Sequence, residues 1–94
     1  MIVTQRFQLM LQQAMQAFEV GNFDGADSIL KTVLQVDPKN LLALNVLGLI
    51  KASETKYTEA ANFFGRAARI SPNDASNQFN LAKALTDSGN DKDA

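Results

Sequence analysis

The sequence contains no cysteine, no histidine and no tryptophan among its 94 residues. Without cysteine and histidine, the chain lacks disulfides, thiolate nucleophiles, imidazole bases and the usual zinc ligands. Its apolar runs are all shorter than the roughly 18 residues that a membrane span needs, and the first residues lack the basic and then apolar stretch of a secretory signal. We therefore expect a cytoplasmic protein that binds no metal, no cofactor and no membrane.

The chain also lacks an excess of charge of one sign, with nine Lys and Arg residues against ten Asp and Glu residues. Because binding to phosphate backbones draws on clustered positive charge, this balance argues against a nucleic-acid partner. A chain of this size buries only about two thirds of its unfolded surface, so its core must be thin and a buried catalytic cleft is not expected. The composition therefore predicts a chain with no enzymatic activity of its own.

What the sequence does contain is typical of helices. Alanine and leucine outnumber the β-branched valine and isoleucine, and unbranched side chains lose less rotamer freedom in a helix. Clusters of glycine, proline, asparagine and aspartate separate the apolar-periodic stretches from one another. We predict helices near residues 4–20, 24–36, 41–54, 58–70 and 75–88, and the start of a sixth helix near Asp91.

Residues that mark turns and close packing recur at one fixed interval along the chain. The interval from Pro38 to Pro72 also separates the successive members of three further sets: Ala26, Ala60 and Ala94; Gly21, Thr55 and Gly89; and Ala14, Gly48 and Ala82. Several registers that agree on one period indicate an internal repeat, here a helix, a turn and a second helix. Neither helix of such a pair buries its apolar stripe alone, so we expect neighbouring pairs to stack on one another.

Residues 41–74 carry the most regular version of this repeat. The residues at its repeat positions are Leu44, Leu47, Gly48, Lys51, Ala60, Phe64, Ala67 and Pro72. This pattern, with its period of about 34 residues, resembles the tetratricopeptide repeat family. Residues 7–40 form a degenerate first repeat that keeps the small residues and the proline but lacks the Leu-Gly pair, and residues 75–94 hold the first helix of a truncated third repeat.

The resemblance implies a single all-α domain, a right-handed α-solenoid of antiparallel helix pairs. It would contain two full repeats, a C-terminal helix and a truncated sixth helix. We expect small residues at fixed positions to let the helix backbones approach closely, and the periodicity predicts which side chains form the core. The predicted core is Met10, Ala14, Ala17, Phe23, Ala26, Leu30, Val33, Leu34, Leu44, Leu47, Gly48, Tyr57, Ala60, Ala61, Phe64, Ala67, Ala68, Leu81, Ala82 and Leu85.

In the resembled family the first helices of successive repeats line a concave groove that holds a peptide or a helix. The resemblance therefore implies a protein–protein interaction module whose partner is a protein or peptide. Carried over by position, the groove residues are Leu11, Gln12, Met15, Leu42, Asn45, Val46, Leu49, Phe79, Asn80 and Lys83. No residue is predicted to be catalytic, to bind a cofactor or to hold a metal.

Two alternatives remain open. Repeats fused to O-linked sugar transferases carry a ladder of asparagines in the groove; Asn80 matches that register, Asn45 is one residue out, and Gln12 supplies a longer amide. The chain would then be the substrate-recruiting N-terminal arm of a larger transferase. The other alternative is a self-association module that forms a homodimer, because a terminal helix of an array leaves apolar side chains uncovered.

Overall fold

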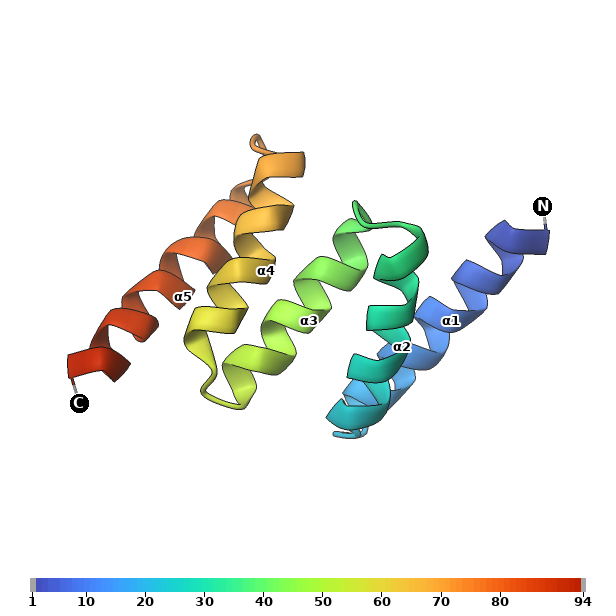
Figure 1. Cartoon of the computed structure of the whole chain (residues 1–94), viewed down its shortest axis with the longest axis horizontal. Coiled ribbons are helices and arrows are strands. Elements are labelled where there is room, and N and C mark those ends of the chain that lie inside the picture. The colour runs from blue at the N-terminus through green and yellow to red at the C-terminus, as the bar shows by residue number, and fades with distance from the viewer. Residues whose placement is uncertain (1, 94) are drawn as a thin grey trace.

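The computed structural model describes residues 2–93, with side chains described for residues 5–89. These residues form five helices and no strand: α1 (Ile2–Glu19), α2 (Phe23–Val36), α3 (Leu41–Ser53), α4 (Tyr57–Ile70) and α5 (Ala75–Asp93). The molecule measures 47 × 29 × 19 Å, with α1 at one end of the longest axis and α5 at the other (Figure 1). The described part of the chain thus has the predicted all-α solenoid fold.

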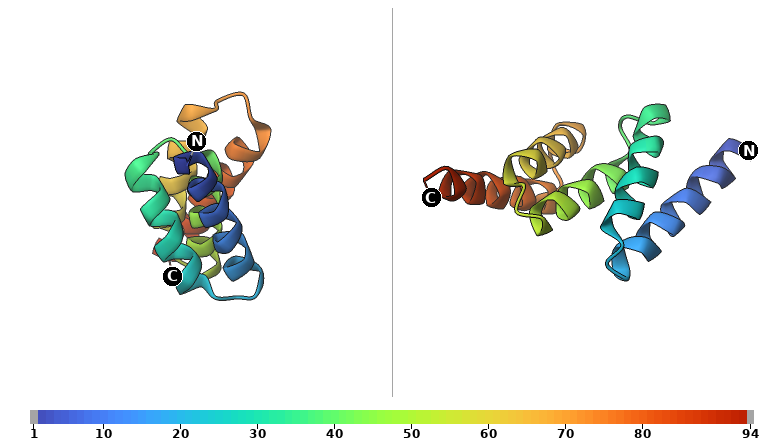
Figure 2. Two further views of the ribbon diagram at one scale, coloured as in Figure 1. Left: turned by 90° about the vertical axis from the view of Figure 1, so that its right-hand side faces the viewer. Right: turned by 60° about the horizontal axis from the view of Figure 1, so that its bottom comes forward.

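Each helix packs chiefly on its neighbours in the sequence. The two hairpins, α1 with α2 and α3 with α4, are joined by contacts of α2 with α3, and α5 packs on α4. α1 also touches α3. The right-hand view of Figure 2 shows the same stepwise arrangement, with α1 and α5 at opposite ends. Because contacts run only between near neighbours, stability is distributed along the array, as in other helical repeats.

The turn between α1 and α2 reverses the chain with a left-handed residue. The amides of Gly21 and Asn22 donate hydrogen bonds to the carbonyls of Phe18 (3.1 Å) and Ala17 (2.8 Å). This pair of bonds is the Schellman arrangement that ends many helices. Gly21 has a φ of 83°, which glycine adopts without the steric penalty that other residues meet.

The turn between α3 and α4 has the same arrangement at the equivalent position of the second repeat. Here the amides of Thr55 and Lys56 donate to the carbonyls of Ala52 (3.0 Å) and Lys51 (2.8 Å). Thr55 has a φ of 61°, although a β-branched residue pays a steric cost in this region. The hydrogen bonds of the backbone therefore recur with the period seen in the sequence, even where the turn residue is poorly suited to its conformation.

The turns that contain the prolines recur in the same way. The amide of Asp37 donates to the carbonyl of Val33 at 2.8 Å, and that of Ser71 donates to the carbonyl of Ala67 at 2.9 Å. A proline follows each donor and stops the helix, since it disfavours helical geometry in the preceding residue and cannot donate the next hydrogen bond. Both kinds of turn thus set the length of each helix pair.

Gly48 of α3 packs directly against the ring of Phe64 on α4. A Cβ atom added to Gly48 would stand 2.6 Å from Cζ of the Phe64 ring, and that ring is only 3% exposed. The corresponding positions of the first hairpin hold Ala14 and Leu30, both fully buried. The second hairpin therefore combines glycine with the larger phenylalanine, and the first hairpin combines alanine with the smaller leucine.

Two predicted core residues, Ala82 and Leu85, are exposed instead, and 56% of Leu85 is accessible to solvent. Both lie on α5. Their counterparts in the preceding repeat, Gly48 and Lys51, are buried because α4 packs on α3. Among the described residues no helix covers this side of α5, so the same positions there face solvent.

The sequence pattern also missed part of the core on α3. Ala43 and Ile50 are fully buried and Val46 is 3% exposed. α3 lies between α2 and α4, so it is covered on more than one side, whereas a single apolar stripe predicts burial on one side only. This corrects the expected place of Val46: its side chain belongs to the core and does not offer a surface to a ligand.

The predicted sixth helix is not separate. α5 continues through Gly89 and the following asparagine to Asp93, without the turn expected there. Gly89 does not take the positive φ that Gly21 has in the turn after α1, so the left-handed residue that ends a helix in that turn is missing here. No helix in the described part of the chain is both long and apolar enough to cross a membrane.

The contact between Gly48 and Phe64 predicts whether a substitution at position 48 raises or lowers the free energy of unfolding. Gly48→Ala gains about 1 kcal/mol of helix propensity, but overpacking against Phe64 costs about 1–3 kcal/mol, so we expect a net loss of stability; Gly48→Leu should lose more than about 1 kcal/mol. In a Phe64→Leu background, Gly48→Ala should instead stabilise the fold. Urea unfolding of the four proteins measures this coupling, and the same sign in both backgrounds would contradict it.

The two left-handed turn residues predict opposite effects. Thr55→Gly relieves the steric cost of a positive φ and should raise the free energy of unfolding by about 0.5–1 kcal/mol. Gly21→Ala, at the equivalent position, should lower it by about 1 kcal/mol, since a Cβ there meets nothing within 4 Å and only the backbone conformation opposes it. Thermal melting of both variants tests the pair, and equal shifts would refute the backbone explanation.

Candidate functional site

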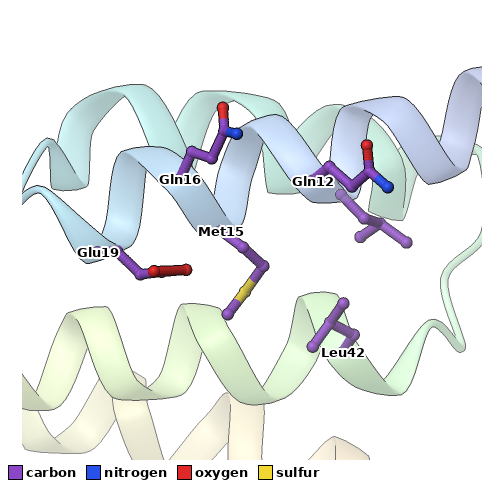
Figure 3. Close-up of a pocket in the computed structure, with 6 residues that line it drawn as sticks. Gln12, Met15, Gln16, Glu19 and Leu42 are labelled. Atoms are coloured by element: carbon purple, nitrogen blue, oxygen red, sulfur yellow. The ribbon is translucent and has the colours of Figure 1, made fainter.

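The first pocket lies between α1 and α3. It has a volume of about 330 Å³ and is lined by Leu11, Gln12, Met15, Gln16, Glu19 and Leu42. The residues of α1 form two neighbouring rows with a step of four residues, 11, 15 and 19 and then 12 and 16, which places them on one face of the helix. Figure 3 shows the thioether of Met15 extending from α1 toward α3, with Leu42 on the facing helix and Glu19 beyond Met15 along α1.

This pocket is apolar at its centre, where Leu11, Met15 and Leu42 lie, and polar at its edges. Met15 is unbranched and polarizable, so it can adapt its shape to the side chain of a partner. Gln12, Gln16 and Glu19 are exposed along α1 and supply amide and carboxylate groups at the rim. Such an edge can accept hydrogen bonds from a peptide backbone, or a positive charge at Glu19.

The second pocket lies between α3 and α5. It has a volume of about 230 Å³ and is lined by Leu49, Ala52, Phe64, Phe79, Asn80, Lys83, Ala84 and Asp87. Phe64 and Ala84 are buried at its base, whereas Leu49 and Phe79 are 42% and 66% exposed. Lys83 pairs with Asp87 one turn later at 3.3 Å between Nζ and Oδ2. The pocket is therefore largely apolar, with one solvated ion pair at its edge.

The structure places most of the predicted groove residues around these two pockets. Leu11, Gln12, Met15 and Leu42 line the first, and Leu49, Phe79, Asn80 and Lys83 line the second. The other two do not line either pocket. Val46 is part of the core, and Oδ1 of Asn45 is buried without a hydrogen-bond partner.

Sequence reasoning left out several lining residues. Gln16 and Asp87 lie one helical turn after the predicted Gln12 and Lys83, so extending the same spacing by four residues would have found them. Phe64 could not be found in this way, because it lies on α4 and was assigned to the core. It reaches the second pocket only because its ring lies beside Gly48, which has no side chain to block it.

A third and smaller cavity of about 140 Å³ lies on α4 alone. It is lined by Glu59, Asn62, Phe63 and Arg66, and the guanidinium carbon of Arg66 stands 5.9 Å from the centre of the Phe63 ring. All four residues belong to one helix face, so the cavity is a shallow gap between neighbouring side chains. The described residues also contain no group of three acidic side chains placed to hold a metal ion.

The pKa of Lys51 is raised above its ordinary value. Its side chain is buried, which by itself lowers the pKa, but the carboxylates of Asp27 and Glu54 raise it by more, so that the pKa lies above 10.5. Nζ of Lys51 stands 3.4 Å from Asp27 Oδ1 on α2 and 3.8 Å from Glu54 Oε1. The cation therefore links the first hairpin to the second, and this structural role accounts for the shift.

Comparisons with known proteins locate a structural relative. No family model and no curated protein sequence matches the chain. Among solved structures, a mutant of the O-GlcNAc transferase of Thermobaculum terrenum superposes with a TM-score of 0.81 and 30% sequence identity, over 87% of this chain. The match covers 16% of the transferase chain, so this chain corresponds to only a small part of that protein.

The position of Lys51 predicts how stability depends on pH. Lys51→Met leaves two carboxylates without their buried cation and should cost about 1–3 kcal/mol near pH 7. Because the pKa is higher in the folded protein, this contribution is complete below 10.5, the value in the unfolded chain, and is lost as the pH rises through the higher folded value.

Urea unfolding of both proteins between about pH 7 and pH 11 measures this difference. Lys31→Met provides a control, because Lys31 pairs with the same Asp27 at 3.1 Å but its side chain is 56% exposed; it should change stability by less than about 1 kcal/mol. A Lys51→Met penalty that grows with pH would contradict the assignment.

Proposed function

We propose that this chain, a tetratricopeptide-like array of helix pairs, is a protein-interaction module that holds a peptide or a helix along α1, α3 and α5. The observation that supports this most directly is the position of the two pockets, which open between successive first helices of the pairs and carry apolar linings. Exposed apolar residues gathered in a concave surface are characteristic of interaction sites.

The spacing of the pockets constrains the ligand. Leu42 and Leu49, both 42% exposed, belong to different pockets and are separated by seven residues of α3, or about 10 Å along the helix. A ligand that fills both pockets needs two apolar side chains at least about 10 Å apart. Residues three apart in an extended peptide or seven apart in a helix meet this requirement.

The expected affinity is moderate. Each apolar anchor that becomes fully buried contributes about 1.5–3 kcal/mol, and two anchors must offset the loss of translational and rotational freedom on association. The rim amides of Gln12 and Asn80 would add hydrogen bonds to the ligand backbone, which hold its register more than they add affinity. In this proposal the chain binds its partner and leaves chemistry to other domains or proteins.

A second candidate function is the substrate-recruiting arm of a larger transferase. The structural similarity to an O-GlcNAc transferase favours it, together with the position of Asn80 at the second pocket. Gln12 at the first pocket provides a second amide along the same face. The coding sequence beyond Ala94 tests this candidate, since a sugar-transferase domain that follows would support it, and any other continuation or a stop codon would reject it.

Glutamate substitutions test the groove. Peptides selected from a random displayed library on the native chain should lose at least about tenfold in affinity for Leu42→Glu or Phe79→Glu, because a carboxylate would have to be buried beside an apolar anchor. Leu85→Glu serves as a control, since Leu85 is 56% exposed, between Leu42 (42%) and Phe79 (66%), but lines neither pocket. Fluorescence anisotropy measures the affinities, and selected peptides that bind all variants alike would rule out the groove.

A further inference from the structure

The second pocket differs from the first in that aromatic rings form part of its lining. Phe64 of α4 lies at its base and is 3% exposed, and Phe79 of α5 forms part of its open edge and is 66% exposed. The residues that line the first pocket are all aliphatic or polar. The two pockets of the groove therefore offer different chemistry to a ligand.

The ring at the base is a consequence of the packing around Gly48. Because Gly48 has no side chain, the Phe64 ring lies directly beside α3 and reaches the second pocket. In the first hairpin the equivalent residues are Ala14 and Leu30, and Leu30 is fully buried and lines neither pocket. The aromatic base is thus specific to the second repeat, and it comes from the contact of α3 with α4 inside the array.

The size of the second pocket suits a single side chain. Its volume is about 230 Å³, which is less than the roughly 300–1,000 Å³ of sites that hold small-molecule ligands. Leu49 and Ala52 of α3 and Phe79 and Ala84 of α5 all line it. A side chain that enters the pocket is therefore held between two helices, above the Phe64 ring.

We propose that the second pocket selects an aromatic side chain of the peptide or helix that the groove binds. This inference rests on the proposed function and names the residue that the ligand brings to one of the two pockets. Aromatic rings favour offset or edge-to-face contacts with one another, and such pairs add to the free energy gained from area burial. A ring in this pocket meets Phe64 at the base and Phe79 at the edge.

The polar groups at the rim suit an aromatic side chain with a polar tip as well. The carboxylate of Asp87 accepts from Lys83 at 3.3 Å and keeps lone pairs for a further donor, and Asn80 presents an amide. A tyrosine hydroxyl or an indole N–H therefore finds a partner there when its ring is buried. The two charged residues of the lining pair with each other, so the pocket favours a charged side chain of neither sign.

Two capped amino acids test the selection without a complete ligand. N-acetyl-tryptophan amide, titrated into the labelled protein, should shift the amide NMR signals of Leu49, Phe79 and Ala84 and leave those of Leu11 and Met15 unchanged. N-acetyl-leucine amide should bind at least about threefold more weakly, because it forms no ring contacts. Equal affinities, or shifts centred on the first pocket, would overturn the proposal.

A double-mutant cycle tests the ring contacts in a peptide complex. Peptides selected on the native chain should contain an aromatic residue, and its replacement by leucine should lower the affinity at least about fivefold. In Phe79→Leu protein this loss should be smaller by at least about twofold, since one of the two rings is gone. Met15→Leu is the matched change in the first pocket and should leave the loss unchanged.

Fluorescence anisotropy measures the four affinities of each cycle. Phe79→Leu should not lower the melting temperature, because Phe79 is 66% exposed, so a change in affinity is not a change in folding. An aromatic residue whose replacement costs the same in Phe79→Leu protein as in the native chain would lie outside the second pocket, and this result would overturn the proposal.

The outcomes distinguish this proposal from the proposed function. Selected peptides that lose affinity for Leu42→Glu protein but accept leucine in place of every aromatic residue would support the groove and overturn the aromatic selection. Selected peptides that bind the native chain, Leu42→Glu and Phe79→Glu equally would reject the groove itself and the aromatic selection with it.

Discussion

The whole structure depends on the fact that no helix of this chain can bury its apolar side alone. A hairpin gains its core where a small residue on one helix leaves room for a large side chain from the next, as Gly48 does for the Phe64 ring. We call such a small residue a notch. A glycine inside a helix costs about 1 kcal/mol relative to alanine, and close packing offsets that cost. The fixed distance along the chain between notch and large residue then sets the length of the turn and of both helices.

The same packing constraint also leaves the surfaces that are open to a ligand. Stacking uses the sides of the first helices that face α2 and α4, and it leaves their remaining face open, where the two pockets form. Among the described residues only α4 packs closely on α5, and Ala82 and Leu85 of α5 are exposed although they occupy core positions of the repeat. The open groove and the exposed side chains of α5 are thus both consequences of the same helix packing.

Electrostatics has a supporting role. Lys51 occupies a position where its stem packs between helices while its ammonium reaches Asp27 on the preceding hairpin. A buried pair of this kind contributes less to net stability than apolar packing of the same volume, but it favours one orientation of the two hairpins over others. Among the described residues, a second ion pair, of Lys83 with Asp87, lies at the edge of the second pocket.

The sequence by itself determined the helices, the repeat interval and the notch at Gly48, because each depends on local propensity or on contacts that recur with the period. Helical spacing also put Leu42 and Phe79 on the faces where the two pockets lie, while their binding role stays a prediction. Only the tertiary structure decided that Val46 is buried, that Phe64 reaches the second pocket and that α5 continues past Gly89. Those outcomes depend on how many neighbouring helices cover each helix, and the periodic pattern of a single helix does not reveal how many there are.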